Sequence, residues 1–531
     1  MMAADSPSSS SSGVARRLAH HHQAVLGLLL GLFVSLVLYT TVSGQFRSTN
    51  TIVVLQSTPA EGTEQNAMTS PPPVSSASSV PNNSIQGSVH DNKEKYQLGQ
   101  TVDASDKMEG DLTRQELDQD GRHGNNGSNV KHGAPRKPIC DLSDLRYDIC
   151  DISGDARAIG LNRTILYVPP ADERDTGGSE WAIKDQSRKL LVDIIEVKVK
   201  TLSTAQSLVA PECTSRHAVP AVVFAMNGLT GNPWHGFGDV LIPLFITTRA
   251  FDGEVQFLVT ELQPWFVDKY RLILANLSRY GIVDFNKDAG VRCYPHIIVG
   301  LHSHRDLGID PARTPRNYTM LDFRMYIRDI FLLTPDGQGI PAVQGGQQEK
   351  RNHRTGTGTE KQKPRLMLIN RGGNRKFVNI PEISAAVQAA GFEVLVEEPS
   401  FEVRLEEFSR VVDSCDVLMG VHGAALTSFF FLRTNAAMLQ VVPWGVDTAM
   451  AYFGVQAKEM MLQDVEYNIA AEESTLYEKY GKDHPMISDP ESIHRQGWEL
   501  TRQYFWLEQD IRINVTRFAP VLHHLLQTLR G

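Results

Sequence analysis

The 531-residue chain lacks an excess of basic side chains, because 52 Lys and Arg residues face 61 Asp and Glu residues and the formal net charge is -9. No global positive field therefore argues for nucleic acid as a partner. From Ile139 onward the sequence also lacks any Asp-x-Asp pair, an arrangement that commonly holds a diphosphate through a metal ion. This absence favours metal-independent binding of such a group by Arg, His and a helix N-terminus.

Cysteines are few, and their odd number of five leaves at least one of them unpaired within the chain. Cys415 stands beside a buried apolar strand, so we expect it to be the free thiol. We expect the other four to form two disulfides, Cys140 with Cys150 and Cys213 with Cys293.

The N-terminus contains an apolar run, Ala24–Val42, that is about long enough to span a bilayer as a helix. Arg16 and Arg17 precede this run and only Arg47 follows it closely, which places residues 1–23 in the cytosol. A cleaved signal peptide is the alternative, but no clear Ala-x-Ala site follows. The sequence thus predicts a single-pass type II protein with its bulk in the lumen. Glycosylation sequons beyond the run agree with this topology: Asn82, Asn126, Asn162, Asn276, Asn317 and Asn514.

Composition divides the remainder of the chain into four parts. Residues 43–137 are rich in Ser, Pro, Asn, Gln and Gly, which predicts a disordered lumenal stem. Residues 138–336 and 364–531 have the apolar density of folded lobes, and the Gly-, Gln- and Lys-rich segment 337–363 is a flexible loop or linker between them. In the first lobe we expect strands to alternate with helices, the pattern of an α/β layer, at Val219–Met226, Val255–Thr260 and His296–Leu301.

The second lobe shows a clearer repeat of strand and helix, which predicts a parallel doubly wound sheet. Ligands of such sheets bind at the carboxyl ends of the strands. The predicted strands are Leu366–Asn370, Phe392–Val396, Asp416–Met419 and Ala437–Val442, and the predicted helices are Pro381–Ala390, Leu405–Ser414 and Ala424–Phe431.

One of these units, Asp416–Phe431, carries a histidine at its turn. The tight turn Gly420–Gly423 joins the strand to the helix, whose N-terminal N–H groups suit a phosphate or diphosphate. Gly423 would let a ligand approach the backbone, and His422 would add a hydrogen-bond donor. The alternative is an ordinary strand connection with a solvent-facing histidine.

A second cationic group follows a neighbouring strand in Asn370–Arg375. Arg371 and Arg375 lie on either side of two glycines and Asn374. Their guanidinium groups match phosphate oxygens. The motif therefore predicts convergence with His422 on one diphosphate. A solvated basic turn is the alternative.

In the first lobe, Asn232 is a good N-cap and Pro233 fits the first position of a helix. His235 and Asp239 then lie four residues apart on one helix face, an arrangement that fits general-base chemistry on a sugar hydroxyl. We predict Asp239 as the base, because a carboxylate is ionised at mildly acidic pH, and His235 as the residue that orients the hydroxyl. The alternative is a helix N-terminus with an Asp that favours the dipole and an incidental His.

Metal-ligand residue types occur together once in the ordered region, at His302, His304 and Asp306. His-x-His is common at zinc sites, which makes a lumenal metal hydrolase an alternative class. No other cluster has obvious ligand spacing, so we predict no metal site.

With these motifs identified, the sequence from about Ile139 to the C-terminus resembles plant members of glycosyltransferase family 61. The segment Cys140–Asp155 resembles the usual start of that family. The other matching segments occur in the family's order: Val219–Phe224, Gly231–Phe245, Leu368–Lys376 and Val421–Thr427.

The resemblance implies an inverting, metal-independent Golgi enzyme of the GT-B type, with two Rossmann-like lobes facing a cleft. It implies a UDP-pentose donor (xylose or arabinofuranose) and a neutral acceptor such as xylan, which the net negative charge also favours over an acidic polysaccharide. His235 and Asp239 match first-lobe residues of the family, and Arg371, Arg375 and His422 match its donor side. Trp234 and Trp444 would offer aromatic surfaces to sugar rings, or else lie in the core.

Two functions within the family remain alternatives, an N-glycan β-1,2-xylosyltransferase and a protein O-GlcNAc-type transferase. The alternative outside enzymes is a membrane-tethered carbohydrate-binding protein that has lost activity.

Overall fold

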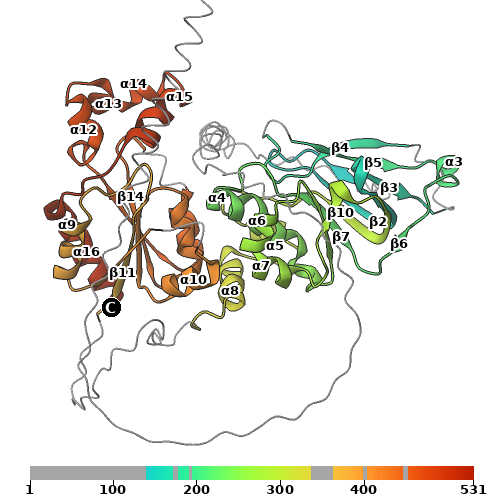
Figure 1. Cartoon of the computed structure of the whole chain (residues 1–531), viewed down its shortest axis with the longest axis horizontal. Coiled ribbons are helices and arrows are strands. Elements are labelled where there is room, and N and C mark those ends of the chain that lie inside the picture. Colours follow the sequence, from blue (N-terminus) through green and yellow to red (C-terminus); the bar gives the residue numbers. More distant parts are fainter. Residues whose placement is uncertain are drawn as a thin grey trace, which may run out of the picture. The chain divides into compact units, whose positions relative to one another are not determined.

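The computed structural model describes residues 139–170, 178–190, 194–335, 363–398, 403–446 and 452–530 (Figure 1). The predicted signal anchor, the stem and nearly all of the loop over 337–363 lie outside these ranges. Among the described helices, none has the length and apolar character needed to cross a bilayer.

The N-terminal part of the described chain forms a ten-stranded mixed sheet with the main path β4-β5-β3-β2-β10-β7-β8-β9. Two short strands pair beside this path, β1 with β2 and β6 with β10. The strands are β1 (Cys140–Asp141), β2 (Ile149–Ile159), β3 (Thr164–Val168), β4 (Glu180–Lys184), β5 (Glu196–Thr201), β6 (Ser215–Arg216), β7 (Ala221–Ala225), β8 (Gln256–Thr260), β9 (Val283–Asp284) and β10 (Val291–Val299).

This part is α/β, as predicted for the first lobe, but its sheet is mixed and so departs from the purely parallel sheet of a Rossmann-like lobe. The strands predicted from apolar runs correspond to β7, β8 and β10, and they do run parallel to one another. However, β2 lies antiparallel to both β10 and β3, so the sheet is mixed. The physical reason is visible in β2, where buried and exposed residues alternate along much of the strand, as in antiparallel strands with one covered face.

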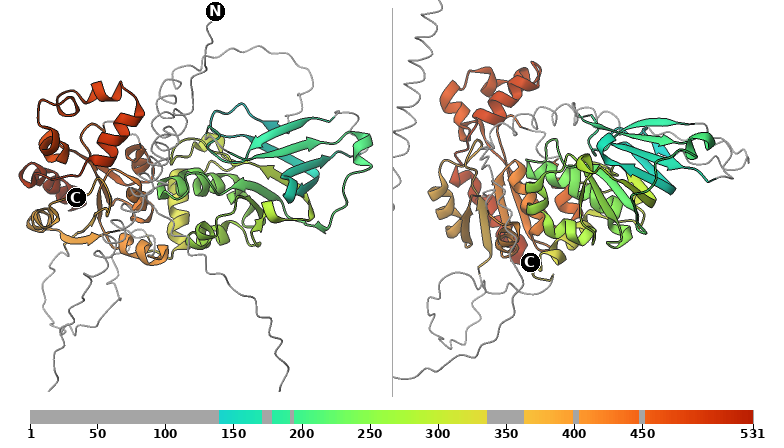
Figure 2. Two further views of the ribbon diagram at one scale, coloured as in Figure 1. Left: turned by 45° about the horizontal axis from the view of Figure 1, so that its top comes forward. Right: turned by 45° about the vertical axis from the view of Figure 1, so that its right-hand side comes forward.

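Helices cover one face of this sheet beside β7 and β10 (Figure 2). They form one apolar cluster with β7 and β8, whereas alternate residues of the same strands pack into a separate cluster on the other face. The helical elements of this part of the chain, covering or not, are α3 (Thr204–Ser207), α4 (Pro233–His235), η2 (Gly236–Leu241), α5 (Ile242–Thr248), η3 (Arg249–Phe251), α6 (Pro264–Lys269), α7 (Arg271–Leu277), η4 (Phe285–Lys287), η5 (Pro311–Arg313) and α8 (Met320–Ile330), with η1 (Gly160–Asn162) between β2 and β3.

The C-terminal part forms a five-stranded sheet in the order β12-β11-β13-β14-β15, and every pair in it is parallel. The predicted doubly wound parallel sheet is therefore confirmed, and the last strand is an addition that the sequence reading missed. The strands are β11 (Arg365–Ile369), β12 (Glu393–Glu397), β13 (Val417–Val421), β14 (Ala437–Val442) and β15 (Gln463–Asn468).

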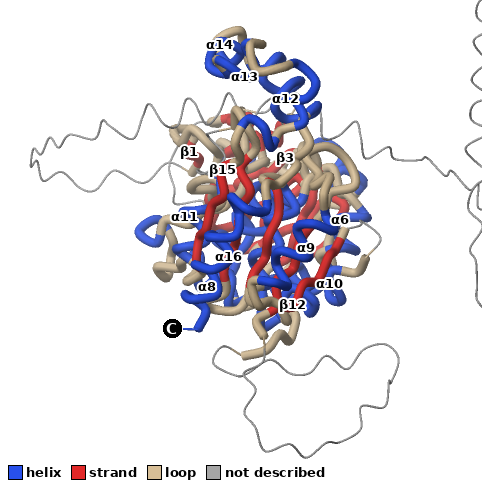
Figure 3. Tube along the Cα trace, turned by 90° about the vertical axis from the view of Figure 1, so that its left-hand side faces the viewer, coloured by secondary structure: helices blue, strands red, loops and turns tan. Residues whose placement is uncertain are grey.

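Both faces of this second sheet are covered by helices, and Figure 3 shows α9 and α16 over one of them. Leu366 and Leu368 pack on that side, while Met367 and Ile369 pack into the cluster that also contains β7 and η2. Two predicted helices are confirmed as α9 (Ile380–Ala389) and α10 (Leu405–Asp413), but η6 (Ala424–Phe431) is a 3-10 helix. The remaining elements are α11 (Gly454–Glu459), η8 (Ala471–Glu473), α12 (Thr475–Tyr480), α13 (Pro485–Ser488), α14 (Pro490–His494), α15 (Trp498–Thr501), η9 (Arg502–Glu508) and α16 (Val515–Arg530).

The two sheets share a core through aromatic contacts between η2 and η6. The rings of Phe237 and Phe430 stack with centroids 4.8 Å apart, and Phe323 of α8 meets both rings edge-on. The fully buried Arg324 of α8 donates hydrogen bonds to the carbonyl oxygens of Leu432 and Met460. These contacts hold the helix that carries His235 against the second sheet.

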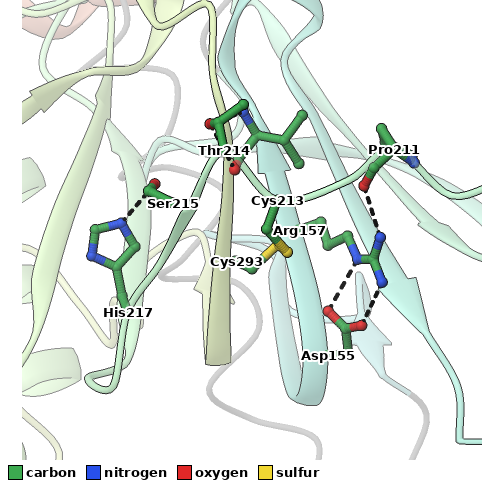
Figure 4. The surroundings of a disulfide bond; sticks show 9 residues. Asp155, Arg157, Pro211, Cys213, Thr214, Ser215, His217 and Cys293 are labelled. Atoms are coloured by element: carbon green, nitrogen blue, oxygen red, sulfur yellow. Dashed lines mark hydrogen bonds and ion pairs between the residues drawn. A yellow bond between two sulfur atoms is a disulfide. The ribbon is translucent and has the colours of Figure 1, made fainter.

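The disulfides agree with the predicted pairing. Cys140 is bonded to Cys150, and Cys213 is bonded to Cys293 of β10 (Figure 4). Cys415 is a free, buried thiol, and burial raises its pKa to about 11.

Candidate active site

The first half of the site lies on one continuous helix, Pro233–Thr248, in which a π-helical segment, η2, separates α4 from α5. Asn232 caps its start, because the Asn232 side chain accepts a hydrogen bond from the backbone N–H of Trp234 at 2.9 Å. Within this helix, Nδ1 of His235 lies 2.7 Å from Oδ2 of Asp239. The predicted pair is therefore in direct contact, and π-helical turns of this kind are frequent at functional sites.

Asp239 is held by a second partner that the sequence did not suggest. Nε of Arg188 lies 3.1 Å from Oδ1 and 3.3 Å from Oδ2 of Asp239, and its Nη2 lies 2.6 Å from Oδ1 of Asp306. Burial acts to raise the pKa of the Asp239 carboxyl, but Arg188 and then His235 lower that pKa below its usual value. Asp239 is thus an ionised carboxylate with both oxygens engaged.

His235 is fully buried, and the contact with Asp239 determines which ring nitrogen carries the proton. An ionised carboxylate accepts hydrogen bonds only, so Nδ1 of a neutral His235 carries the proton and Nε2 keeps its lone pair. Nε2 is buried and has no hydrogen-bond partner in the described part of the chain. Chemically, such a carboxylate-oriented imidazole is an acceptor for a proton.

The second half of the site lies at the switch point of the parallel sheet. The chain leaves β11 for β12 on one side and returns to β13 on the other, and ligands bind where the strand order reverses in this way. Arg371, Asn374 and Arg375 follow β11, while His422 and Gly423 follow β13. The structure therefore brings the two predicted donor-side motifs together at neighbouring strand ends.

Their mutual contacts define a compact group. Nη1 of Arg375 donates to the carbonyl oxygen of His422 at 3.1 Å, and Nη2 of Arg371 lies 3.5 Å from Oδ1 of Asn374. Gly423 has a φ of 149°, and a Cβ at this position would collide with the guanidinium of Arg371. Only a glycine fits there, which leaves the backbone and two guanidinium groups close together.

His422 is a buried, neutral side chain in this group. Burial, and then the charge of Arg375, lowers its pKa to about 3. Its Nδ1 lies 2.8 Å from Oε1 of Gln440 on β14, and its ring meets the edge of Trp506 with centroids 5.3 Å apart. Trp506 comes from the second π-helical segment, η9, and its ring also lies 4.7 Å from the guanidinium carbon of Arg375.

A chain of ring contacts connects the two halves. Trp234 meets His235 with centroids 4.9 Å apart and Tyr452 at 5.9 Å, and Tyr452 meets His422 at 5.6 Å. The imidazole on the first helix and the cationic group at the sheet switch point are therefore two aromatic rings apart. Trp444, the other predicted aromatic surface, donates its indole N–H to the carbonyl oxygen of Met486 at 3.0 Å in a separate apolar cluster.

The alternative metal site separates into three different environments. His302 contacts the Tyr147 hydroxyl through Nδ1, and His304 accepts the backbone N–H of Asp310 through its own Nδ1. Asp306 is paired with Arg146 and Arg188, both at 2.6 Å. The described residues contain no group of three or more His, Cys, Asp or Glu side chains arranged to hold a metal ion.

Sequence reasoning missed the residues that support the site. Arg188 and Trp506 come from segments far from the motifs, and Arg146 lies within Cys140–Asp155, where no local pattern marks it as part of the site. Asp306 was noted only as a potential metal ligand, although its structural role is to pair with the two arginines.

Comparison with known proteins places this arrangement among transferases. Residues 234–439 match the family described as Glycosyltransferase 61. The alpha-1,3-arabinosyltransferase XAT2 of Oryza sativa subsp. japonica is 38% identical over 443 residues, which are 82% of this chain and 69% of that protein. The beta-1,2-xylosyltransferase XYXT1 of the same organism is 38% identical over 410 residues, 74% of this chain and 84% of that protein. The xylan glycosyltransferase MUCI21 of Arabidopsis thaliana is 34% identical over 390 residues, 72% and 78% of the two chains.

Proposed function

The chain belongs to glycosyltransferase family 61, and from this membership we propose that it transfers a pentose, xylose or arabinofuranose, from a UDP-sugar to a xylan-type polysaccharide. The support for the pentose is the names of the relatives, an arabinosyltransferase and a xylosyltransferase each at 38% identity. The support for the acceptor is the name of the xylan glycosyltransferase at 34% identity.

The observation that carries the chemistry is the His235–Asp239 contact, connected through Trp234 and Tyr452 to the donor-side group. In the proposed reaction the acceptor hydroxyl oxygen forms a bond to the anomeric carbon of the sugar. The bond from that carbon to the β-phosphate oxygen breaks, and UDP leaves with the electron pair. The hydroxyl proton passes to the base. Because the hydroxyl attacks on the face opposite the leaving UDP, the anomeric configuration inverts in one displacement.

The geometry favours His235 as this base, in place of Asp239. Both carboxylate oxygens of Asp239 are engaged by Arg188 and His235, and a lowered pKa makes a carboxylate a weaker base. Nε2 of His235 has no hydrogen-bond partner among the described residues, so its lone pair is unoccupied, and Asp239 holds the ring in the required tautomer. Asp239 as the base stays a prediction, and the variants Asp239→Asn and His235→Gln distinguish it from this assignment.

On the donor side, we assign the diphosphate to the group around Arg375 and Gly423. The backbone N–H groups after β13 and two guanidinium groups would stabilise the charge that develops on the leaving group. A neutral His422 adds a hydrogen-bonding atom without adding charge. This arrangement requires no metal ion for the charge of UDP.

We further propose that the protein is a type II Golgi membrane protein whose described part lies in the lumen. The apolar run Ala24–Val42 and the preceding Arg16 and Arg17 support this orientation. The two disulfides fit an oxidising compartment. Protease protection in sealed microsomes tests it, and digestion of the described region without detergent would contradict it.

The transferase activity is tested with the purified full-length chain in detergent. UDP-xylose, UDP-arabinofuranose and UDP-N-acetylglucosamine are each offered with xylo-oligosaccharides, and products are analysed by mass spectrometry and NMR. We expect one pentose to be transferred to the oligosaccharide with inverted configuration. Transfer of N-acetylglucosamine alone, or hydrolysis without transfer, would contradict the proposal.

A further inference from the structure

A run of four polar residues, residues 185–188, is almost completely buried beneath the first half of the site. Their exposed fractions are 0% for Asp185, 7% for Gln186, 1% for Ser187 and 3% for Arg188. Buried polar side chains need partners, and each of these four side chains has a hydrogen-bond partner outside the run. The run lies outside residues 234–439, which match the family.

The partners of this run connect it to β7, β8 and the helix of the site. The carbonyl oxygen of Asp185 accepts from the backbone N–H of Ala225, and its Oδ2 accepts from the Thr260 hydroxyl at 2.5 Å. Ser187 Oγ donates to the carbonyl oxygen of Asp239 at 2.5 Å. These bonds anchor the backbone before Arg188, and the backbone N–H of Lys189 anchors it after Arg188 by donating to the carbonyl oxygen of Arg146 at 2.8 Å, so the guanidinium is held beside Asp239.

The charges in this region balance only when Arg188 is present. Arg188 and Arg146 together face the carboxylates of Asp239 and Asp306, and His235 faces Asp239 from the same helix. Arg146 contacts Asp306, so loss of Arg188 would leave His235 as the one partner of the Asp239 carboxylate among the described residues. A buried carboxylate without a cation is costly, and it would recruit a second proton onto the imidazole as its counter-charge.

We propose that Arg188 is a positioning residue that keeps Asp239 ionised without a cationic His235, and thereby keeps Nε2 of His235 free to accept the proton of the acceptor. This inference rests on the proposed function for its catalytic meaning. Its electrostatic content, that Arg188 sets the protonation state of the His235–Asp239 pair, does not depend on which sugar is transferred.

The first test measures kcat/KM against pH for Arg188→Gln, Arg188→Lys and a control, Arg157→Gln. Arg157 is paired with Asp155 at 2.6 Å near the Cys213–Cys293 disulfide, far from the site motifs in sequence, and Figure 4 shows its surroundings. In Arg188→Gln we expect a lower rate and an acidic limb displaced upward by roughly one to three pH units, the usual effect of an adjacent arginine on a carboxyl. Part of the lost activity should therefore return at higher pH.

Arg188→Lys keeps the positive charge, so the acidic limb of its pH profile should stay close to that of the wild type even where its rate falls. Arg157→Gln should have the wild-type profile. A uniform loss of rate in Arg188→Gln, with the shape of the pH profile unchanged, would overturn the proposal in favour of a purely structural role. If Arg188→Gln does not fold, Arg188→Lys decides alone. An acidic limb displaced upward in Arg188→Lys by the roughly one to three pH units expected for loss of the charge would overturn the proposal.

The second test does not need activity. The titration of His235 is followed by NMR in protein with 13C-labelled histidine, and its signal is assigned by its loss in His235→Gln. We expect the titration to move upward in Arg188→Gln and to stay in place in Arg157→Gln. If the wild type transfers no pentose, the proposed function fails, while this titration still decides the role of Arg188. An unmoved His235 signal would refute that role even in an active enzyme.

Discussion

Replacing Asp239 by Asn tests the base assignment most directly, because it changes one atom in the centre of the hydrogen-bond network. The carboxylate accepts from Nε of Arg188 and from Nδ1 of His235 at the same time. An amide has one oxygen, and the fixed guanidinium can only donate, so the oxygen should turn to Arg188. The NH2 group would then face His235 and force the ring proton from Nδ1 to Nε2, where it blocks proton acceptance.

The expected magnitude follows from the loss of general-base catalysis. That loss typically costs about 10²- to 10⁴-fold in rate, which corresponds to roughly 3–5 kcal/mol of transition-state stabilisation. His235→Gln should fall in the same range, and the double variant should be little worse than either, because the two residues act as a unit. The affinity for UDP should be nearly unchanged, since the donor-side group lies on the other sheet.

The assay is single-turnover transfer, which separates chemistry from binding and product release, together with calorimetric titration of UDP. The matched control is Asp151→Asn, which changes a more exposed His–Asp pair. Oδ1 of Asp151 lies 2.7 Å from Nε2 of His296, the same distance as between His235 and Asp239. This control should transfer at the wild-type rate.

Two results would refute the reasoning in different ways. If Asp239→Asn is inactive while His235→Gln transfers normally, Asp239 is the base, as the sequence reading predicted. If both variants behave like Asp151→Asn, the pair is a structural contact and the base lies elsewhere.

Three further predictions address the donor site, the metal and stability. Arg375→Ala should weaken UDP binding or slow transfer by about tenfold to a hundredfold, the worth of a charge-assisted hydrogen bond, whereas Arg495→Ala on the surface should do neither in the same titration. Turnover should persist in EDTA, and a rate that collapses on chelation and returns with manganese would show that a metal carries the diphosphate charge. Burial raises the pKa of Asp185 from 3.8 to about 7, so the folded protein holds a proton there that the unfolded chain loses. The free energy of unfolding should therefore fall as the pH rises across that window, by at most about 1.4 kcal/mol per pH unit. Asp185→Asn should remove this slope in thermal melts, and a difference from the wild type that is constant with pH would contradict the expected titration.

The second sheet was predictable because its central strands β11, β13 and β14 are almost wholly buried and its chemistry is local. Such strands appear as continuous apolar runs, and β14 spans Ala437–Val442, the range that the run predicts. The motifs at the ends of β11 and β13 lie directly after those runs, so the rule for parallel sheets was enough to bring Arg375 and His422 together. The His235–Asp239 contact was predictable in the same way, from a spacing of four on a helix.

The first sheet was less predictable because its outer strands bury one face only. Half of each such strand is polar, and no single residue distinguishes an antiparallel partner such as β2 from a parallel one. The form of η6 was also mispredicted, since Ala424–Phe431 is as apolar as a buried α-helix but adopts the 3-10 conformation.

The sequence by itself therefore determined the family, the parallel sheet and the two local motifs, because helix spacing, apolar runs and strand-end turns are properties of neighbouring residues. Only the tertiary structure decided how those motifs act. Arg188 reaches Asp239 from 51 positions away, and Trp506 reaches His422 from another helical segment. Such contacts form when distant segments fold into one core, and in that low-dielectric setting they decide which atom carries a proton.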